Sequence, residues 1–351
     1  LEFRRSALMR RGDATITGQV LRDSCGMVET IDAIEPTWRD WNAAAKAFNA
    51  GSQRLKRGVG IGCSWYGMGN TALSNPSEMK LGVAADGRIT LYCGAVDIGQ
   101  GSNTILTQIA AEALGVAAGE IALITGDTAR TLDAGKTSAS RQTFVSGKAC
   151  ELAALDLKAK LDALGDHAAL RNLPADNHGD VLTGYGKFDP PTTPLDANGQ
   201  GIPYACYGFA TQVALVEVDL DLGKVKVLKI AAAHDVGKAI NPQQVEGQIH
   251  GGTAQGIGLA LMEEYIPGRT ENLHDYLIPT FGDMPEMICI IVEDPTEHGP
   301  HGAKGVGEPA LISTAPAIFG GIYRAAGVRV TKVPVLPHRL RAAIRAKENA
   351  R

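Results

Sequence analysis

A single carboxylate at the end of a glycine-rich run is the first candidate for chemistry in this sequence. Residues 302–309 read Gly-Ala-Lys-Gly-Val-Gly-Glu-Pro, and an apolar stretch follows from 310 to 322. Glycines let a backbone approach a ligand closely, and proline suits the first turn of a helix. A carboxylate at such a place, shielded from water, could act as a base near neutral pH. Spacing alone favours a simpler alternative, in which Glu308 caps an ordinary helix.

Two polar loops could hold an anion. Residues 97–103 follow a predicted strand and precede a helix predicted from Thr104 to Leu114, which is a frame for binding an anion on backbone N–H groups. Residues 136–143 combine hydroxyls, an amide and a guanidinium before a second predicted helix, and Arg141 could pair bidentately with a phosphate. An N-cap cluster of serines and threonines explains the second loop equally well.

Glycines also recur inside two predicted elements. They alternate along the strand-like run 59–70, which indicates close sheet packing or approach to a ligand. The helix predicted over residues 243–261 contains the run 251–258 with four glycines, each costing about 1 kcal/mol against alanine. Close approach of another backbone or of a bulky ligand would explain them. His298 and His301 are spaced for a metal, but no third ligand accompanies them, so no metal-binding residue is predicted.

The elements that must position these groups follow a repeated order. Strands at 79–83 and 88–93 flank Asp86-Gly87, a hairpin signal. Strands at 212–218 and 224–230 flank a second turn, and each hairpin leads to an Asp-x-Gly segment and a helix. The order indicates either a weak internal duplication or chance similarity.

The length of 351 residues predicts two lobes. We expect an α+β fold in which each lobe is a mixed or antiparallel sheet with packed helices. The chain opens on Leu1 in a mid-domain type of sequence, so we expect a subunit or fragment whose remainder lies upstream or on another chain. The predicted parts are an N-terminal helical and linker segment (1–58), lobe one (59–170), a connection (171–201) and lobe two with Glu308 (202–351).

Composition excludes several classes of protein. Apolar residues make up 44% and the net charge is −4, so neither nucleic acid nor a membrane is an expected partner. The six cysteines stand singly, without a CxxC pair, which argues against iron–sulfur or structural zinc sites in this chain. Isolated cysteines and the lack of a visible signal peptide or membrane span favour a reducing, cytoplasmic location.

Four segments taken together resemble one family. Residues 97–101, 137–143, 254–258 and 305–309 are similar, in this order, to the molybdenum hydroxylases, the xanthine dehydrogenase and aldehyde oxidase family. The resemblance covers nearly the whole chain and corresponds to the C-terminal half of the molybdenum-binding subunit. Residues 66–77 look closest to bacterial members that hydroxylate N-heterocycles such as purines and nicotinate.

The resemblance implies a role for each matching residue. Glu308 matches the glutamate beside the molybdenum, which acts as the base. Gln100 and its neighbours match a pterin-binding loop, residues 138–142 match the loop at the phosphate end, and Gln255 matches a glutamine that contacts the pterin. The cofactor-binding residues implied are Gly99, Gln100, Gly101, Ser102, Ser138, Ala139, Ser140, Arg141, Gln142, Gln255, Gly305 and Gly307.

The same resemblance implies the cofactor and the partners. The cofactor is molybdopterin with molybdenum, commonly in the cytosine dinucleotide form in bacterial members, and the pterin dithiolene rather than a protein residue holds the metal. A chain or segment carrying the first molybdenum domain should complete the site. Iron–sulfur clusters and FAD are expected on partner chains or domains. A metal lowers the pKa of a bound oxygen ligand, and a nearby carboxylate can take the proton.

Three alternative functions are consistent with these motifs. The first is a molybdenum hydroxylase subunit that oxidises an electron-poor carbon of an N-heterocycle, or an aldehyde in an alternative member of the same family. The second is a structural or assembly subunit that keeps the fold without catalysis. The third is a free-standing nucleotide-binding protein, which would bind a nucleotide tightly without a partner.

Overall fold

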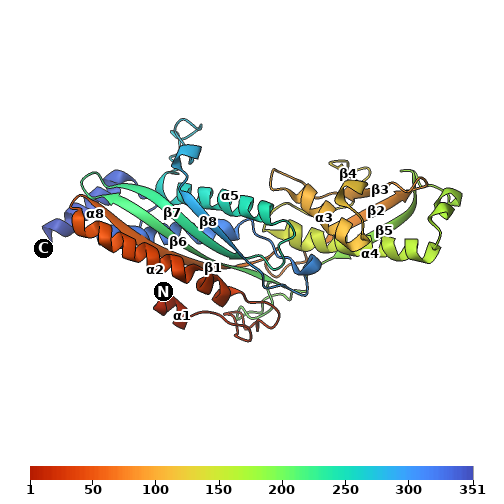
Figure 1. Cartoon of the computed structure of the whole chain (residues 1–351), viewed down its shortest axis with the longest axis horizontal. Helices are drawn as coiled ribbons and strands as arrows, with labels where there is room; N and C mark the ends of the chain where they lie inside the picture. Colours follow the sequence, from red (N-terminus) through yellow and green to blue (C-terminus); the bar gives the residue numbers. More distant parts are fainter. Residues whose placement is uncertain (351) are drawn as a thin grey trace.

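A computed structural model describes residues 1–350 as an elongated molecule with a four-stranded sheet in each half and helices packed on both (Figure 1). Each sheet is mixed, which confirms the predicted α+β class. The helices are α1 (Glu2–Ser6), α2 (Met27–Gly51), α3 (Ser102–Leu114), α4 (Gly147–Leu164), α5 (Pro242–Leu261), α6 (Pro309–Ile312), α7 (Thr314–Ala326) and α8 (Pro337–Asn349). The strands are β1 (Leu55–Gly67), β2 (Ser77–Ala84), β3 (Ile89–Cys93), β4 (Ile121–Thr125), β5 (Asp180–Phe188), β6 (Tyr207–Asp219), β7 (Lys224–Asp235) and β8 (Glu286–Val292).

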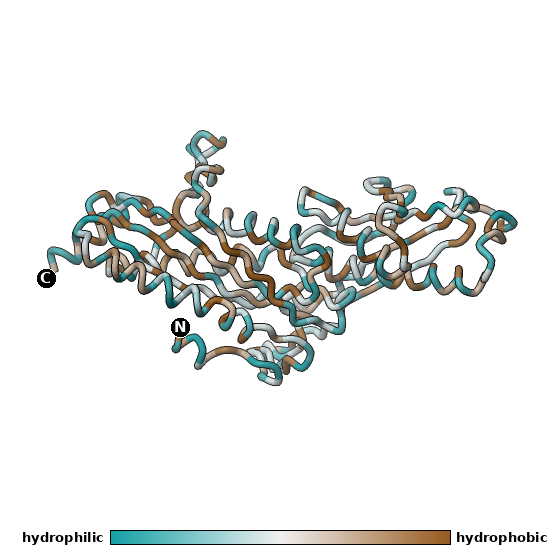
Figure 2. The backbone as a smooth tube through the Cα atoms, in the orientation of Figure 1, coloured by the Kyte–Doolittle hydropathy of each residue, from teal (hydrophilic) through white to brown (hydrophobic). Residues whose placement is uncertain are grey.

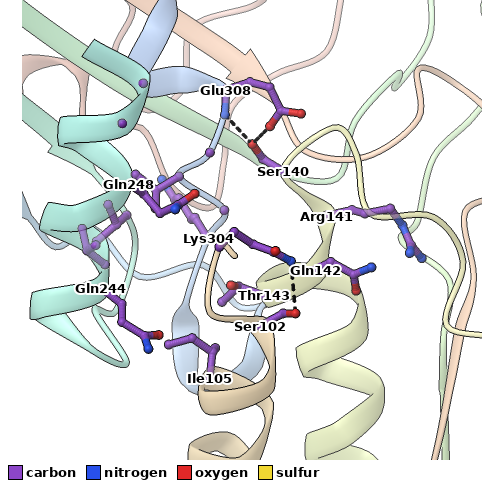
Figure 3. Close-up of a pocket in the computed structure, with 18 of the residues that line it drawn as sticks. Ser102, Ile105, Ser140, Arg141, Gln142, Thr143, Gln244, Gln248, Lys304 and Glu308 are labelled. Atoms are coloured by element: carbon purple, nitrogen blue, oxygen red, sulfur yellow. Dashed lines mark hydrogen bonds between the residues drawn. The ribbon is translucent and has the colours of Figure 1, made fainter. Parts of the chain in front are cut away.

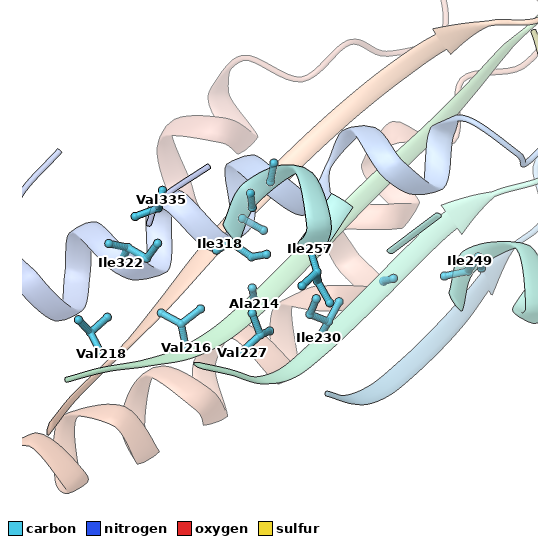
Figure 4. Packing of buried hydrophobic residues seen from close by; sticks show 14 of the residues in the cluster. Ala214, Val216, Val218, Val227, Ile230, Ile249, Ile257, Ile318, Ile322 and Val335 are labelled. Atoms are coloured by element: carbon cyan, nitrogen blue, oxygen red, sulfur yellow. The ribbon is translucent and has the colours of Figure 1, made fainter. Parts of the chain in front are cut away.

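The large sheet has the strand order β1-β6-β7-β8 and is covered on both faces. Side chains alternate along β6, as the pleat of a strand requires. Val213 and Leu215 pack against Trp38 of α2. Val216 and Ile318 belong to the opposite core, between the sheet and helices α5, α7 and α8 (Figure 4). Each such aliphatic side chain contributes about 1.5–3 kcal/mol on burial, so both faces hold the sheet in place.

The small sheet has the order β4-β3-β2-β5 and packs against α3 and α4. Met79, Leu81 and Leu91 of its strands meet Leu106 of α3 and Leu157 of α4 in one buried cluster. Helix α3 ends as the sequence predicts, at a left-handed Gly115 whose N–H donates to the carbonyl of Ala111.

The two sheets share one topology. In the small sheet the antiparallel pair β2/β3 is followed by α3 and by β4, which runs parallel to β3. In the large sheet the antiparallel pair β6/β7 is followed by α5 and by β8, parallel to β7. The repeated order seen in the sequence is therefore a repeat of structural units.

The alternating glycines of β1 lie against the backbone of helix α7. The carbonyls of α7 lie directly on the strand, and a Cβ at Gly60 would stand 1.9 Å from the carbonyl oxygen of Ala317. Gly58 and Gly62 make equally close approaches to the same helix. Of the two alternatives for these glycines, close packing is the one observed.

The sheets cross the predicted lobe boundaries. Residues 59–67 were expected in lobe one, but β1 pairs along its whole length with β6 of the large sheet. Strand β5 lies inside the predicted connection 171–201 and forms an edge of the small sheet. The small-sheet lobe is thus an insertion between β1 and β6. The predicted apolar helix 310–322 is also interrupted, at Ser313, whose hydroxyl donates to the Ser64 hydroxyl at 2.8 Å.

Apolar segments follow the strands of the large sheet, and hydrophilic segments gather in the loops (Figure 2). A search of residues 1–350 finds no helix with the length and hydropathy needed to cross a membrane.

Candidate functional site

A cavity of about 580 Å³ lies where segments from both lobes meet. The small-sheet lobe contributes the loop before α3 and the loop 137–143. The large-sheet lobe contributes one side of α5, residues 304–308 and the end of β1. These five segments, far apart in the sequence, therefore share one cavity, and Figure 3 shows side chains of several of them.

Most of the predicted site residues line this cavity. Three do not: Gly99, Gly101 and Ala139 have φ of 105°, 87° and 57°, and they belong to the two loops without facing the cavity. The predicted residues in the wall are Gln100, Ser102, Ser138, Ser140, Arg141, Gln142, Gln255, Gly305, Gly307 and Glu308.

Glu308 contacts the opposite lobe rather than its own helix. Its side chain makes no capping hydrogen bond at the start of α6. Instead the Ser140 hydroxyl donates to Glu308 Oε2, and the Glu308 N–H donates to Ser140 Oγ at 3.0 Å (Figure 3). The capping alternative therefore does not describe this residue, and the two lobes meet at this pair.

The glycines before Glu308 allow the lobes to come this close. A Cβ at Gly305 would lie 2.0 Å from the carbonyl oxygen of Ser140. Ser140 itself has a φ of 51°, a left-handed conformation that is uncommon for a residue with a side chain. Such strain is often found at ligand-binding sites, and here it aims the Ser140 hydroxyl at the Glu308 carboxylate.

Arg141 has a different environment from the one expected. Its side chain is fully buried, and the guanidinium donates to four backbone carbonyls. These belong to Ala134, to Lys136 at 3.2 Å, to Asn75 at 3.1 Å and to Pro76 at 2.8 Å. With these carbonyls as its partners, the guanidinium ties the loop to the start of β2. These contacts occupy both terminal nitrogens of the guanidinium, so in this structure they are not free for the bidentate phosphate pairing considered from the sequence.

Gln142 is likewise engaged within its own loop. Its amide nitrogen donates to the hydroxyl of Thr137 at 2.9 Å, and its amide oxygen accepts from Ser146 at 2.5 Å. These bonds lie along a π-helical turn over Gln142–Ser146 that leads into α4. Turns of this kind often occur at functional sites.

In the loop before α3, the backbone N–H groups bind a carboxylate of the loop itself. The Asp97 carboxylate accepts from the backbone N–H groups of Gly99 at 2.8 Å, Gly101 at 3.3 Å and Asn103 at 3.0 Å. Burial alone would raise the pKa of Asp97, but these three donors outweigh it and lower the pKa below its ordinary value. The N–H groups expected to bind a ligand anion are thus used by Asp97. Gln100 lines the cavity, but its amide nitrogen donates to the Val96 carbonyl at 3.2 Å and to the Ser102 hydroxyl at 3.1 Å.

Helix α5 supplies a row of amides, of which only one was predicted. Gln244, Gln248 and Gln255 all line the cavity together with Gly251. Their spacing of four, three and four residues places them on one side of a helix. Glutamines and a glycine repeated at this period along the helix were the signal that could have identified Gln244 and Gln248.

Tyr66 is a second cavity residue that the sequence did not single out for a role. It lies near the end of β1, opposite Gly208 of β6, and shares the cavity wall with Glu308. Burial, followed by the negative charge of Glu308, raises the pKa of Tyr66 to about 12. The phenol is therefore protonated at neutral pH and can donate a hydrogen bond.

The two histidines considered for a metal lie outside this cavity. The His301 ring contacts Glu151 at 3.2 Å and the carbonyl of Ile109 at 3.4 Å. Over residues 1–350, no three His, Cys, Asp or Glu side chains are grouped closely enough to hold a metal ion.

A family model described as the molybdopterin cofactor-binding domain matches residues 33–285, well over half of the chain. The chain belongs to this molybdopterin-binding family. The match extends from α2 to the start of β8 and includes the cavity residues of both polar loops and of α5. The resemblance carried by the four segments is confirmed.

Two curated relatives match almost the whole chain. A putative xanthine dehydrogenase molybdenum-binding subunit of Escherichia coli K12 is 31% identical over 97% of this chain and 49% of its own length. An aldehyde oxidoreductase of Megalodesulfovibrio gigas is 33% identical over 99% of this chain and 38% of its own. The chain thus spans half or less of the length of these relatives.

Solved structures of molybdopterin-family proteins agree with the fold. The aldehyde oxidoreductase of Desulfovibrio desulfuricans superposes with a TM-score of 0.88 at 33% identity, covering 95% of this chain and 37% of that one. Quinoline 2-oxidoreductase of Pseudomonas putida superposes with a TM-score of 0.77 at 25% identity, covering 95% of this chain and 47% of that one.

The cavity fits a pterin by its own chemistry. A Cβ at Gly251 would meet nothing within 4 Å, so α5 leaves open space where a side chain would otherwise fill the cavity. The amide oxygen of Gln244 is buried without a hydrogen-bond partner among the described residues. Amides offer both donors and acceptors, and the edge of a pterin ring alternates donors and acceptors in the same way.

Proposed function

We propose that this chain binds molybdopterin in the cavity and forms part of a molybdenum hydroxylase in which Glu308 is the general base. One observation carries the proposal. The Glu308 carboxylate, free of any capping role, lies in the cavity wall and is held there by the hydroxyl of Ser140 from the opposite lobe.

The cofactor would be held by the side chains that face the cavity. Gln248 and Gln255 offer amides to the pterin, and Ser138 lies in the loop proposed for the phosphate end. Gln100 lies in the same wall, with its amide bonded inside its own loop to Val96 and Ser102. Arg141 would act indirectly, because it fixes the shape of that loop through backbone carbonyls. The dinucleotide form with cytosine is part of the proposal, and mass spectrometry of the extracted cofactor tests it.

The residues of this chain have separate roles in the proposed reaction. When bound, the cofactor supplies two-electron chemistry for transfer of water-derived oxygen to carbon. Glu308 accepts the proton that this transfer releases, and Oε1 is the oxygen available because Oε2 receives the Ser140 hydroxyl. The Tyr66 phenol can donate a hydrogen bond toward substrate in the same wall. Ile98, Val236 and Leu311 line the cavity with apolar surface and exclude water.

The proposed substrate is an N-heterocycle of purine or nicotinate type with an electron-poor carbon. In support, a relative named as subunit gamma of the 6-hydroxypseudooxynicotine dehydrogenase complex of Paenarthrobacter nicotinovorans is 30% identical over 86% of this chain. An aldehyde is the second candidate, supported by the 33% identity to an aldehyde oxidoreductase. Turnover of the whole complex on purines, nicotinate and aldehydes separates the two.

The proposed partners complete the enzyme. A second polypeptide or segment carries the first molybdenum domain, and iron–sulfur and FAD subunits or domains take up the electrons. The alternative is an assembly subunit without catalysis. Metal analysis of the purified complex distinguishes them: about one molybdenum per copy is expected of the enzyme, and none after careful isolation supports the scaffold.

The base role is tested by Glu308→Gln in the assembled complex. The substitution keeps the shape of the side chain but removes proton acceptance, so turnover per bound molybdenum should fall by at least about 100-fold. Cofactor content should stay near that of the wild type. Glu297→Gln is the matched control, because Glu297 is exposed and does not line the cavity. Wild-type turnover in Glu308→Gln would contradict the proposal.

A further inference from the structure

The loop that carries Glu308 is tied to the end of strand β7 on both sides. Upstream, Lys304 contacts Asp235, the last residue of β7. Downstream, the carbonyl of Ala310 is held by Gln212, which also contacts His234. Glu308 lies between these two attachments, so the loop is fixed directly by Asp235 of β7 on one side and by Gln212 of β6, which contacts His234 of β7, on the other.

The upstream attachment is a buried ion pair. Lys304 Nζ lies 2.5 Å from Asp235 Oδ2, and both side chains are fully buried. The Gly237 N–H donates to Asp235 Oδ1 at 3.0 Å, and the Gly26 N–H donates to Oδ2 at 3.3 Å. The backbone reinforces the pair, since the Lys304 N–H donates to the carbonyl of Val236 at 2.9 Å. A carboxylate with this many donors specifies one geometry for the loop.

The downstream attachment is the side-chain amide of Gln212, whose nitrogen and oxygen both have partners. Gln212 Nε2 donates to the Ala310 carbonyl at 2.8 Å and contacts His234 Nε2 at 3.2 Å. Gln212 Oε1 accepts from the Thr314 hydroxyl at 2.7 Å. All three side chains are buried. Burial lowers the pKa of His234 to about 4, so its ring is neutral near pH 7 and Nε2 can accept the second amide proton.

None of Gln212, His234 and Asp235 lines the cavity. Successive residues of a strand point to opposite faces, so His234 and Asp235 reach the Glu308 loop from different sides of β7. A polar group buried for packing alone is costly. Here Asp235 contacts Lys304 and Gln212 contacts Ala310 of the segment that presents Glu308, while His234 contacts Gln212. A misplacement of about 1 Å can lower a rate about 100-fold.

We propose that the Lys304–Asp235 ion pair and the Gln212–His234 pair are positioning elements that set the place of the Glu308 carboxylate. The inference rests on the proposed function of Glu308. Gln212, His234 and Asp235 lie outside the cavity and act through Glu308, whereas Lys304 also lines the cavity wall.

The test uses Gln212→Met in the assembled, cofactor-loaded complex. Methionine keeps the volume of the side chain and removes its three hydrogen bonds. Turnover per molybdenum should fall by about 10- to 100-fold, with KM and molybdenum content within about twofold of the wild type. The matched control is Thr211→Val on the same strand. It removes a buried hydroxyl that contacts Thr30 at 2.9 Å, away from the Glu308 loop, and it should keep wild-type turnover.

A double-mutant cycle separates positioning from general loss of stability. In a Glu308→Gln background, Gln212→Met should lower turnover by less than about twofold, because residues acting through one group are non-additive. Equal losses in Gln212→Met and Thr211→Val, or full additivity with Glu308→Gln, would overturn the inference. If Gln212→Met does not fold, the double variant Asp235→Asn/Lys304→Met replaces it, with the same cycle and the same criteria.

The outcomes for the two proposals differ. Wild-type turnover in Glu308→Gln contradicts the base role itself. Loss of turnover in Glu308→Gln together with wild-type turnover in Gln212→Met contradicts only the positioning role.

Discussion

At the scale of single residues, Arg141 connects stability to cofactor binding. Its guanidinium is fully buried and binds four backbone carbonyls from two segments. Hydrogen bonds to charged groups contribute about 1.5–3 kcal/mol each. Arg141→Ala should therefore lower the free energy of unfolding by at least about 3 kcal/mol, as measured by urea titration. The loop at the cavity should lose its shape, and molybdenum content should fall with it.

The exposed Arg88 provides a control for this prediction. Arg88→Ala should change the free energy of unfolding by less than about 0.5 kcal/mol. If Arg141→Ala retained both wild-type stability and wild-type molybdenum content, the four carbonyl contacts would not have the importance assigned to them.

The contribution of Asp97 to the stability of the fold should depend on pH. Its pKa is lowered in the folded chain, where burial is outweighed by three backbone N–H donors. A carboxyl with a lowered native pKa stabilises the fold above its unfolded pKa of about 3.9, and that contribution is lost as the pH falls through the native pKa. Asp97→Ala should lose about 1 kcal/mol of stability at pH 7, which is the size typical of losing a side chain that accepts from N–H groups at a helix N-terminus.

The difference between the wild type and Asp97→Ala should shrink as the pH is lowered below 4. Urea titrations at several pH values measure it. Asp97→Asn keeps the shape without the charge, so its own stability should show less acid dependence than that of the wild type. A constant difference from pH 7 to pH 3 would show that the charge of Asp97 does not matter.

At the scale of elements, the contact between β1 and α7 should be intolerant of any side chain. A Cβ at Gly60 would stand 1.9 Å from the backbone oxygen of Ala317, which cannot move without shifting the helix. Gly60→Ala should destabilise the chain by about 1–3 kcal/mol or more through overpacking. Gly247→Ala on α5 is the control, because nothing lies within 4 Å of its Cβ. It should be neutral or stabilising by up to about 1 kcal/mol. Thermal unfolding of both variants measures the contrast.

Local signals in the sequence were enough for most elements. The hairpin around Asp86-Gly87 and the end of α3 at Gly115 depend on residues next to each other in the chain, and both are present. The pairing of β1 with β6 joins residues separated by the whole small-sheet lobe. No turn or periodicity within β1 specifies that partner, which is why the lobe boundaries were misplaced.

The sequence predicted which residues belong to the site better than it predicted the partners that those residues contact. Glu308, Gln100 and Gln255 stand in recognisable segments, and all three line the cavity. The environment of Arg141 could not be read from its neighbours, because two of its four carbonyl partners, Asn75 and Pro76, come from a distant segment. The Ser140–Glu308 contact likewise forms only when the two lobes meet.

At the scale of the whole molecule, the cavity exists because the small-sheet lobe is inserted between β1 and β6. The insertion leaves β1 and the Glu308 loop on one lobe and the two polar loops on the other. The resulting wall is shared by both lobes, so a change in their relative position would separate Ser140 from Glu308. Cofactor binding between the lobes should therefore stabilise both together.

One segment of the molecule stands apart from both cores. Residues 262–283, between α5 and β8, project from the body of the large-sheet lobe (Figure 1), and Met284 after them packs against its core. Phe281 is 97% exposed, Leu273 is 70% exposed and Tyr265 is 69% exposed. Exposed apolar groups gathered in this way mark surfaces that associate with other molecules. We therefore expect the chain, when purified by itself, to self-associate through this segment.

The double variant Leu273→Ser/Phe281→Ser tests this expectation. Both side chains are largely exposed, so the melting temperature should stay within about 2 °C of the wild type. Self-association measured by light scattering at increasing protein concentration should decrease, because the apolar area available for contact is smaller. Leu222→Ser is the control, since Leu222 is 56% exposed but lies in a hairpin away from the projecting segment. A lowered melting temperature in the double variant would mean that the segment packs on the body, and unchanged self-association would mean that another surface is responsible.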